Sequence, residues 1–139
     1  MVDISDKNDT KRTAIATGLI KMNPETLIAI KENQLSKGDV LGVARIAGIM
    51  AAKSTPQLIP LCHHIVLNNI QVEFVFIDKA TIAITATTKA DYKTGVEMES
   101  LTAVSIAALT IYDMCKGIDK HMSITDISVV SKTGGKSTG

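Results

Sequence analysis

The residues best suited to acid–base chemistry lie at the two ends of one predicted helix, residues 94–116. Asp113 and Lys116 are one helical turn apart near its end, where a carboxylate can orient and charge-stabilise a lysine used as an acid or a base. Glu99 lies near its start, about 21 Å away along the axis. One small ligand cannot touch both ends of one helix. Either the two ends serve different jobs, or two subunits each contribute one end to a shared site, which is the hypothesis we prefer.

A different interpretation of the same pair is a surface ion pair at a helix terminus, with no chemical role. The composition of the helix argues against that reading, because Ile106 and Leu109 lie on the same stripe as Glu99, Asp113 and Lys116. A purely structural helix has no need for a stripe that mixes apolar residues with charges of both signs.

Several cations could bind an anionic ligand. Lys37 precedes a helix that Asp39 is predicted to cap, so it lies near positive backbone amides, and partial burial would lower its pKa. Four other cations could add positive charge to a phosphate pocket: Arg12, Arg45, Lys93 and Lys136. Taken singly, each of them is better explained as a solvated surface charge.

The segment around Lys136, Gly134 to Ser137, looks like the end of a phosphate-binding loop, but Val130 stands where that motif needs its first glycine. Its glycine amides and lysine could still close over an anion, or the segment could be a disordered tail.

The run Cys62-His63-His64 has three side chains of the types that bind metals. A structural zinc site needs four ligands, commonly with a Cys-x2-Cys pair, and the chain has no such pair. Two other interpretations remain: a packed thiol beside a structural histidine, or a histidine that hydrogen-bonds a ligand or moves protons.

Composition narrows the class of protein. The chain has 139 residues, 45% of them hydrophobic and 3% aromatic, and its 15 Lys and Arg residues against 14 Asp and Glu residues give a net charge of +1. Nucleic-acid binding needs an excess of clustered cations, so no such partner is expected. Two cysteines, the lack of a secretion signal and the lack of a long apolar run predict reduced thiols in a cytoplasmic protein that does not enter a membrane.

The predicted elements alternate in a recognisable order. Strands are expected at residues 11–22, 70–77, 80–88 and 122–132, and helices at 24–33, 39–54 and 94–116. Asn23 is expected to cap the first helix, and Gly42 and Gly48 to let another backbone approach the second. The order β-α-α-β-β-α-β predicts an α+β, ferredoxin-like fold, a four-stranded antiparallel sheet with helices on one face.

All 139 residues are expected to form one domain, with a loose arm at 1–10, an apolar loop after the second helix and a flexible Gly-rich tail at 133–139. Apolar residues on both faces of the central hairpin, such as Val75 beside Phe74, leave one face of the sheet to be covered by another subunit. An oligomer is therefore expected.

Four segments together resemble one known family. KGDVLGVARIAGIMAAK, LIPLCHH, KTGVEMESLTAVSIAALTIYDMCK and SKTGGKS, together with the opening MVDISDK, are similar in sequence and order to the MoaC family of molybdenum cofactor biosynthesis. His64 departs from the pattern, since many members have proline there. The resemblance implies a ferredoxin-like hexamer, a trimer of dimers with active sites between subunits. It also implies conversion of a cyclised dihydroguanosine triphosphate, a purine-derived small molecule, into cyclic pyranopterin monophosphate with release of pyrophosphate.

The resemblance also implies roles for individual residues. Lys37 and Lys116 would be acid–base lysines tuned towards neutrality, with Asp113 beside Lys116, and the two lysines could enter one site from different chains. The residues expected to line the substrate pocket are Leu61, Cys62, His63, Met98 and Glu99, the last as an acceptor for a guanine-like N–H edge. The residues expected to meet phosphates are Arg12, Lys136 and Arg45.

No cofactor is implied, no metal ligands are assigned, and the sequence leaves open whether Mg²⁺ accompanies the triphosphate. Two rival functions stay open at this point. A regulatory α+β module would bind a nucleotide between subunits without turnover and would not need the Asp113–Lys116 pair. A structural assembly protein would bind no ligand at all.

Overall fold

A computed structural model describes residues 1–135. Within them the sheet has the order β2-β3-β1-β4, and every pair of neighbouring strands is antiparallel. This arrangement confirms the predicted α+β class with a four-stranded antiparallel sheet. In chain order the elements are β1 (Thr10–Lys21), α1 (Pro24–Lys31), α2 (Val40–Lys53), α3 (Thr55–Leu58), β2 (Asn69–Asp78), β3 (Thr81–Tyr92), α4 (Glu97–Cys115) and β4 (Ser123–Thr133).

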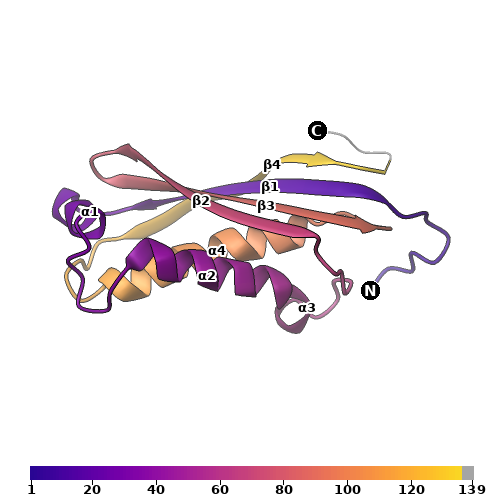
Figure 1. Ribbon diagram of the computed structural model, residues 1–139, viewed down its shortest axis with the longest axis horizontal. Coiled ribbons are helices and arrows are strands. Elements are labelled where there is room, and N and C mark those ends of the chain that lie inside the picture. The colour runs from indigo at the N-terminus through magenta and orange to yellow at the C-terminus, as the bar shows by residue number, and fades with distance from the viewer. Residues whose placement is uncertain (136–139) are drawn as a thin grey trace.

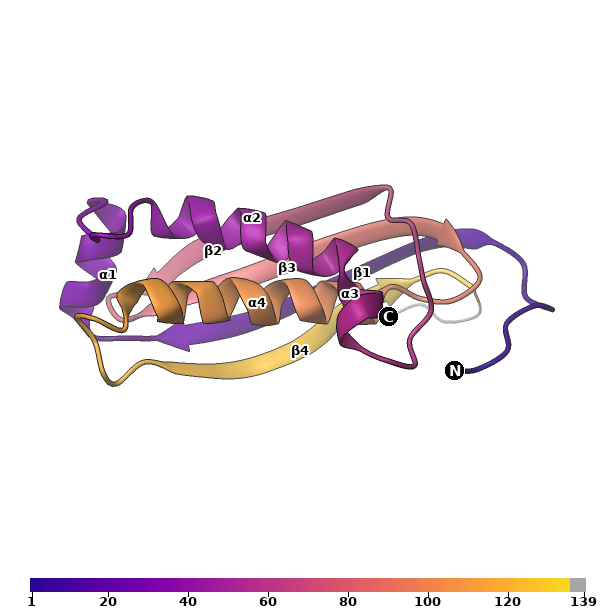
Figure 2. The ribbon, with the colours of Figure 1, turned by 90° about the horizontal axis from the view of Figure 1, so that it is seen from below.

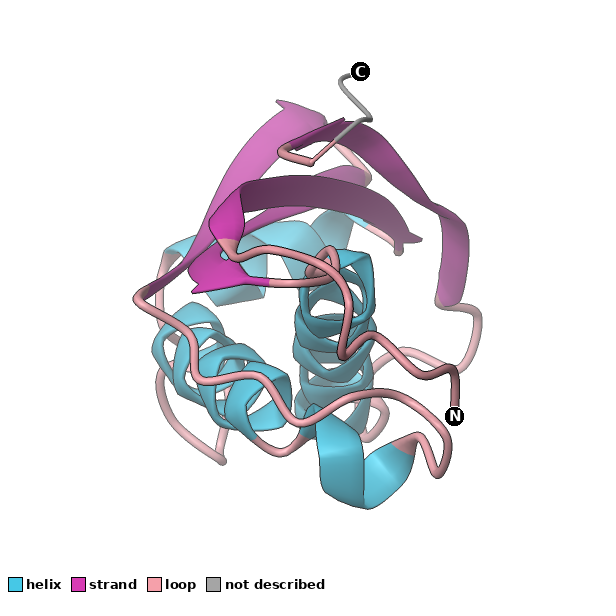
Figure 3. Cartoon of the chain, turned by 90° about the vertical axis from the view of Figure 1, so that its right-hand side faces the viewer, coloured by secondary structure: helices cyan, strands magenta, loops and turns pink. Residues whose placement is uncertain are grey.

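The two long helices cover one face of the sheet, as predicted. Figure 1 shows α2 and α4 below the sheet, with α1 at one end of the molecule and α3 near the other. Seen from below, α2 and α4 lie side by side and run in opposite directions (Figure 2). Viewed end-on, the strands arch over both helices (Figure 3). The start and the end of α4 therefore lie at opposite ends of the molecule.

Alternation along the strands builds the core. In β3, residues Ile82, Ile84 and Ala86 are fully buried against the helices, while the residues between them face outward. On the outer face Val75 and Val130 are 55% and 54% exposed. The opposite face of the sheet is thus left uncovered within one chain, as the apolar pattern of the hairpin predicts.

Gly48 lets the backbone of α4 approach α2 closely, as predicted. A Cβ atom on this residue would lie 3.0 Å from the carbonyl oxygen of Ala103 in α4 and 3.3 Å from Val72 in β2. For Gly42 the prediction was wrong, since a Cβ atom there would meet the carboxylate of Asp39 instead of another backbone. That carboxylate caps α2, as expected, by accepting a hydrogen bond from the Gly42 N–H at 3.1 Å.

Some element boundaries differ from the prediction. The segment 55–58, expected to end a helix and begin a loop, forms the short helix α3. Pro56 is tolerated because the first turn of a helix does not need its missing N–H. Strand β3 continues to Tyr92 instead of ending at 88, since β1 pairs with it as far as Thr10, and α4 begins at Glu97 instead of 94. Thr133, expected in the tail, is the last residue of β4.

The start of α1 also differs from the prediction. Asn23 occupies the cap position, but its side chain makes no capping hydrogen bond. A carboxylate from a distant part of the chain binds this end of α1: Asp119 accepts hydrogen bonds from the Asn23 N–H and from the Thr26 hydroxyl, both at 2.8 Å. A sequence window around α1 cannot reveal this partner, because it lies more than ninety residues away.

Candidate functional site

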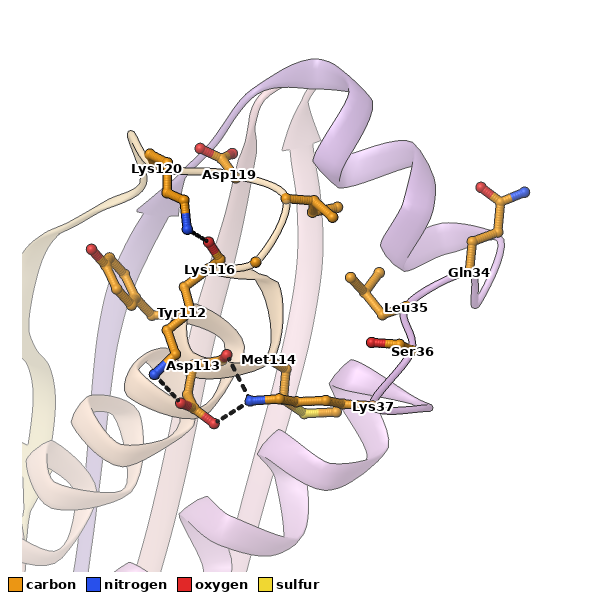
Figure 4. A pocket seen from close by; sticks show the side chains of 12 residues that line it. Gln34, Leu35, Ser36, Lys37, Tyr112, Asp113, Met114, Lys116, Asp119 and Lys120 are labelled. Atoms are coloured by element: carbon orange, nitrogen blue, oxygen red, sulfur yellow. Dashed lines mark hydrogen bonds and ion pairs between the residues drawn. The ribbon is translucent and has the colours of Figure 1, made fainter.

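A carboxylate between two lysines forms the first part of the site (Figure 4). Asp113, near the end of α4, has its Oδ1 2.9 Å from the Nζ of Lys116 and its Oδ2 3.2 Å from the Nζ of Lys37. Lys37 comes from the loop between α1 and α2, and its Nζ also lies 3.3 Å from the Asp113 carbonyl oxygen. The three residues that the sequence selected as catalytic are therefore brought together within one chain.

This arrangement corrects one expectation. The two lysines were considered as contributions from different chains, but here they share a single carboxylate of their own chain. The mouth of the cluster is open, and all three side chains are more than half exposed. A ligand could therefore reach both ammonium groups from the same side.

The ion pairs set the charge state of the cluster. Hydrogen bonds from Lys116 and then Lys37 lower the pKa of the Asp113 carboxyl. In return, the hydrogen bond and charge of Asp113 raise the pKa of Lys116 above its usual value. The expected tuning towards neutrality is therefore wrong for Lys116 in this chain, which holds its proton more tightly than a free lysine.

The cluster forms part of a groove of about 690 Å³. One wall is the loop that follows α1, including Leu35 and Lys37; the other is the turn that follows α4. On that turn, Lys120 donates a hydrogen bond from Nζ to the Lys116 carbonyl oxygen at 2.8 Å. Three ammonium groups around one unburied carboxylate give the groove a net positive charge, which suits an anionic ligand.

A second group of predicted residues lies at the start of α4. Glu99 is only 2% exposed, and burial, partly offset by its own backbone N–H, raises the pKa of its carboxyl, with Glu97 adding to the rise. Burial also raises the pKa of the Cys62 thiol, and the charge of Glu99 raises it further. The charge of Glu99 therefore reaches the thiol of Cys62, although the two residues are far apart in sequence. Met98 is partly buried beside Glu99 in the chain, and Leu61 is 70% exposed.

His63 contacts the N-terminal arm near this end. Its Nε2 lies 2.6 Å from the Val2 carbonyl oxygen, so Nε2 carries the hydrogen and donates it. With Nε2 engaged, the Nδ1 of the ring is the nitrogen left for a ligand or a proton. The arm thus orients the histidine that the sequence selected.

A small polar cavity of about 170 Å³ lies at the start of α4, where one carboxylate, Glu97, and three cations line it: Lys7, Arg12 and Lys132. The guanidinium of Arg12 is fixed by donating from Nε to the Tyr92 carbonyl at 3.1 Å and from an Nη to the Lys93 carbonyl at 3.0 Å. The sequence singled out Arg12 but missed Lys7 and Lys132. The pairing of β4 with β1, in which Lys132 faces Ala14, was the signal that could have found Lys132.

One predicted phosphate ligand, Arg45, joins neither group. Arg45 donates from Nε to the Val72 carbonyl oxygen at 2.9 Å, and its guanidinium lies 5.5 Å from the centre of the Phe74 ring. It therefore packs against β2. Lys136 and Ser137 lie outside the described residues. The last two described glycines, Gly134 and Gly135, have φ angles of 117° and 60° and turn the chain tightly against Arg12.

The two groups of site residues are separated by the length of α4. Asp113 follows Glu99 by 14 residues, about 21 Å along the axis.

Cys62 and Cys115 are both free thiols, and Cys115 is fully buried with its pKa raised by burial to about 11. Among residues 1–135, no three His, Cys, Asp or Glu side chains are grouped as metal ligands would be. In the same range, no helix combines the length and apolar character needed to cross a bilayer.

Comparison with known proteins shows which family the chain belongs to. The MoaC family matches residues 1–135. A Brevibacillus brevis protein is 58% identical over 137 residues, covering 99% of this chain and 86% of the relative. A Clostridium perfringens protein is 59% identical over 138 residues (99% and 87%), and a Rhodospirillum rubrum protein is 56% identical over 138 residues (99% and 83%). All three relatives are named cyclic pyranopterin monophosphate synthase. At this identity and coverage, the chain belongs to the MoaC family.

Proposed function

We propose that this chain is a cyclic pyranopterin monophosphate synthase of molybdenum cofactor biosynthesis. It converts the cyclised dihydroguanosine triphosphate into the cyclic monophosphate and releases pyrophosphate. Besides the family and the name shared by its relatives, the observation that carries the proposal is the Lys37–Asp113–Lys116 cluster. A module that only bound nucleotides would not need a carboxylate held between two lysines.

Lys116 acts as an acid in this proposal. Lys116 carries a proton at neutral pH as any lysine does, and Asp113, which raises its pKa further, holds the ammonium in place until a nitrogen or oxygen of the purine-derived ring becomes basic enough to take that proton as the ring opens and recloses. Lys37, on the other side of the same carboxylate, moves a second proton or stabilises developing negative charge. Asp113 keeps both ammonium groups in place.

Forming the cyclic phosphate requires a sugar hydroxyl to lose its proton and attack the phosphorus nearest the sugar. The bond from that phosphorus to pyrophosphate then breaks, and cations must balance the charge of the leaving group. The cavity lined by Lys7, Arg12 and Lys132 supplies three such cations against the single carboxylate of Glu97, and its small size suits a phosphate group. We assign the triphosphate to this cavity.

The base-like part of the substrate is assigned to the residues near the start of α4. Glu99 meets its N–H edge, with Cys62, His63, Met98 and Leu61 around it. Because burial raises the pKa of Glu99, this carboxyl can also hold a proton more readily than an exposed one, and could donate as well as accept a hydrogen bond.

Two subunits supply one site. The start of α4 from one chain faces the Lys37–Asp113–Lys116 cluster of another, because a single chain keeps these groups about 21 Å apart. We propose a homo-hexamer, a trimer of dimers, in the cytoplasm. Its support within one chain is the exposed apolar surface on both outer faces: Val75, Ile77 and Val130 on the sheet, and Val43, Ile46 and Met50 on α2.

The test is turnover of the cyclised triphosphate by the purified protein and by Lys116→Ala, with binding measured separately. Loss of an acid–base residue typically lowers the rate by about 100- to 10,000-fold. The proposal predicts a fall of that size with substrate binding retained. If the parent protein binds the triphosphate but does not release pyrophosphate, the nucleotide-binding module is the better description.

A further inference from the structure

Asp119 is a buried carboxylate that joins two segments of the groove. It is only 2% exposed and lies on the turn after α4 (Figure 4). Its Oδ2 accepts hydrogen bonds from the Asn23 N–H and the Thr26 hydroxyl, and its Oδ1 accepts one from the His121 N–H at 2.9 Å. The link therefore ties the start of α1 to the end of α4.

A buried carboxylate is costly unless its oxygens are well hydrogen-bonded. Burial alone would raise the pKa of Asp119, but the hydrogen bonds from Asn23, His121 and Thr26 outweigh it and lower the pKa. The charge is thus held in place by three donors. A surface turn could be closed more cheaply by a glycine or an exposed polar residue, so this arrangement needs a reason.

The position of the link supplies that reason. Helix α1 leads directly into the loop that carries Lys37, and α4 ends in Asp113 and Lys116. These are the two walls of the groove. Lys37 and Asp113 meet through flexible, exposed side chains at 3.2 Å, which alone would fix their separation poorly. The link through Asp119 and Thr26 is buried, and it joins the helix that leads into one wall to the turn that forms the other.

We infer that Asp119 and Thr26 are positioning residues that fix the wall carrying Lys37 relative to the wall carrying Asp113 and Lys116. Thr26 does not line the groove. Asp119 does line it, but its carboxylate oxygens are already engaged by the Asn23 N–H, the Thr26 hydroxyl and the His121 N–H. The effect of Asp119 and Thr26 passes through the backbone of α1 and of the turn after α4. The inference rests on the proposed function, since the cluster must act on substrate for its geometry to matter.

Thr26→Val tests this role with little change in shape. It removes the hydroxyl but leaves both backbone donors to Asp119. A misplacement of about 1 Å can lower a rate about 100-fold, so partial loosening of the link predicts a fall in kcat of about tenfold. KM should change little, because the residues assigned to the base-like part and the phosphates lie at the other end of α4. Thr26→Ser keeps the hydroxyl and should restore kcat.

Thr55→Val is the matched control. Thr55 is also fully buried, and its hydroxyl also donates hydrogen bonds, to the carbonyls of Ala51 and Ala52, but at the opposite end of the molecule. All variants are assayed well below their melting temperatures. Should a valine variant fail to fold, Thr26→Ala is compared with Thr55→Ala in the same way. Equal losses of kcat at positions 26 and 55, or an unchanged kcat in Thr26→Val, overturn the inference.

Lys116→Ala, assayed in parallel, separates this inference from the proposed function. If Lys116→Ala keeps full activity, the role proposed for the cluster is wrong, whatever Thr26→Val does. If Lys116→Ala is inactive and Thr26→Val turns over like the parent, the cluster stands and the positioning role is wrong.

Discussion

Replacing Gly48 with alanine tests whether the close packing of α2 on α4 is required. The new methyl group would lie 3.0 Å from the Ala103 carbonyl oxygen and 3.4 Å from the Ala107 Cβ. Overpacking of this kind costs about 1–3 kcal/mol. Alanine gains about 1 kcal/mol over glycine within a helix. Because the nearest atom belongs to a helix backbone, which cannot move aside as a side chain can, the cost should dominate, with a net loss of about 1 kcal/mol.

The assay is urea denaturation of Gly48→Ala at neutral pH, compared with Gly117→Ala. A Cβ atom on Gly117 meets nothing within 4 Å, so its substitution should leave the free energy of unfolding unchanged or raise it by about 0.4–1 kcal/mol. Lys37 precedes α2 and Asp113 lies on α4, so any widening between the helices should also weaken their contact. A Gly48→Ala protein more stable than the parent would show that the two helices do not need this approach.

Four further predictions concern the charges and the thiols. Asp113→Asn should lower the pKa of Lys116 towards its usual 10.5, measured by NMR titration of the lysine Nζ, and an unchanged pKa would contradict the ion pair. The same substitution should abolish the stability that Asp113 contributes above its usual pKa of 3.8, which the parent loses as pH falls through the lowered value. Glu99→Gln should lower activity yet stabilise the fold at pH 7. The pKa of Glu99 is raised in the folded protein, so ionisation of Glu99 weakens folding as pH rises above 4.5, and the stability difference from the parent should vanish below that pH. A variant that is less stable than the parent at pH 7 would contradict the reasoning. Alkylation of the folded protein at pH 8 followed by mass spectrometry should modify Cys62 and spare Cys115, whose buried thiol has a pKa of about 11; equal labelling would show that α4 opens readily.

Much of the fold could be predicted from local patterns. Alternation predicted strands at residues 11–22 and 70–77, close to the observed β1 and β2, and Asp39 identified the start of α2. The errors arose where a distant partner decides the structure. Asn23 was expected to cap α1 with its side chain, and nothing in its neighbourhood indicates that its backbone N–H is bound by the distant Asp119. The extension of β3 to Tyr92 depends on its pairing with β1.

In the site, too, local patterns predicted some contacts and distant partners decided the others. Asp113 and Lys116 could be paired from helical spacing alone, but the approach of Lys37 to the same carboxylate depends on how the loop after α1 packs. Lys132 was missed because only the register of β4 on β1 places it at the cavity of Arg12. Arg45 was selected by charge, whereas its contacts with Val72 and Phe74 follow from the packing of α2 on β2.

The shared site is tested most directly by mixing two inactive proteins. Lys116→Ala removes a group at the end of α4, and Arg12→Ala removes one from the cavity beside its start. If each site takes these two groups from different subunits, exchange of equal amounts should restore roughly a quarter of the parental sites. Pairing Lys116→Ala with Lys37→Ala is the matched control and should restore nothing, because both lysines bind the same Asp113. Recovery only in the first mixture is the predicted result. Absence of recovery there, with subunit exchange verified by mass spectrometry, would contradict the shared site.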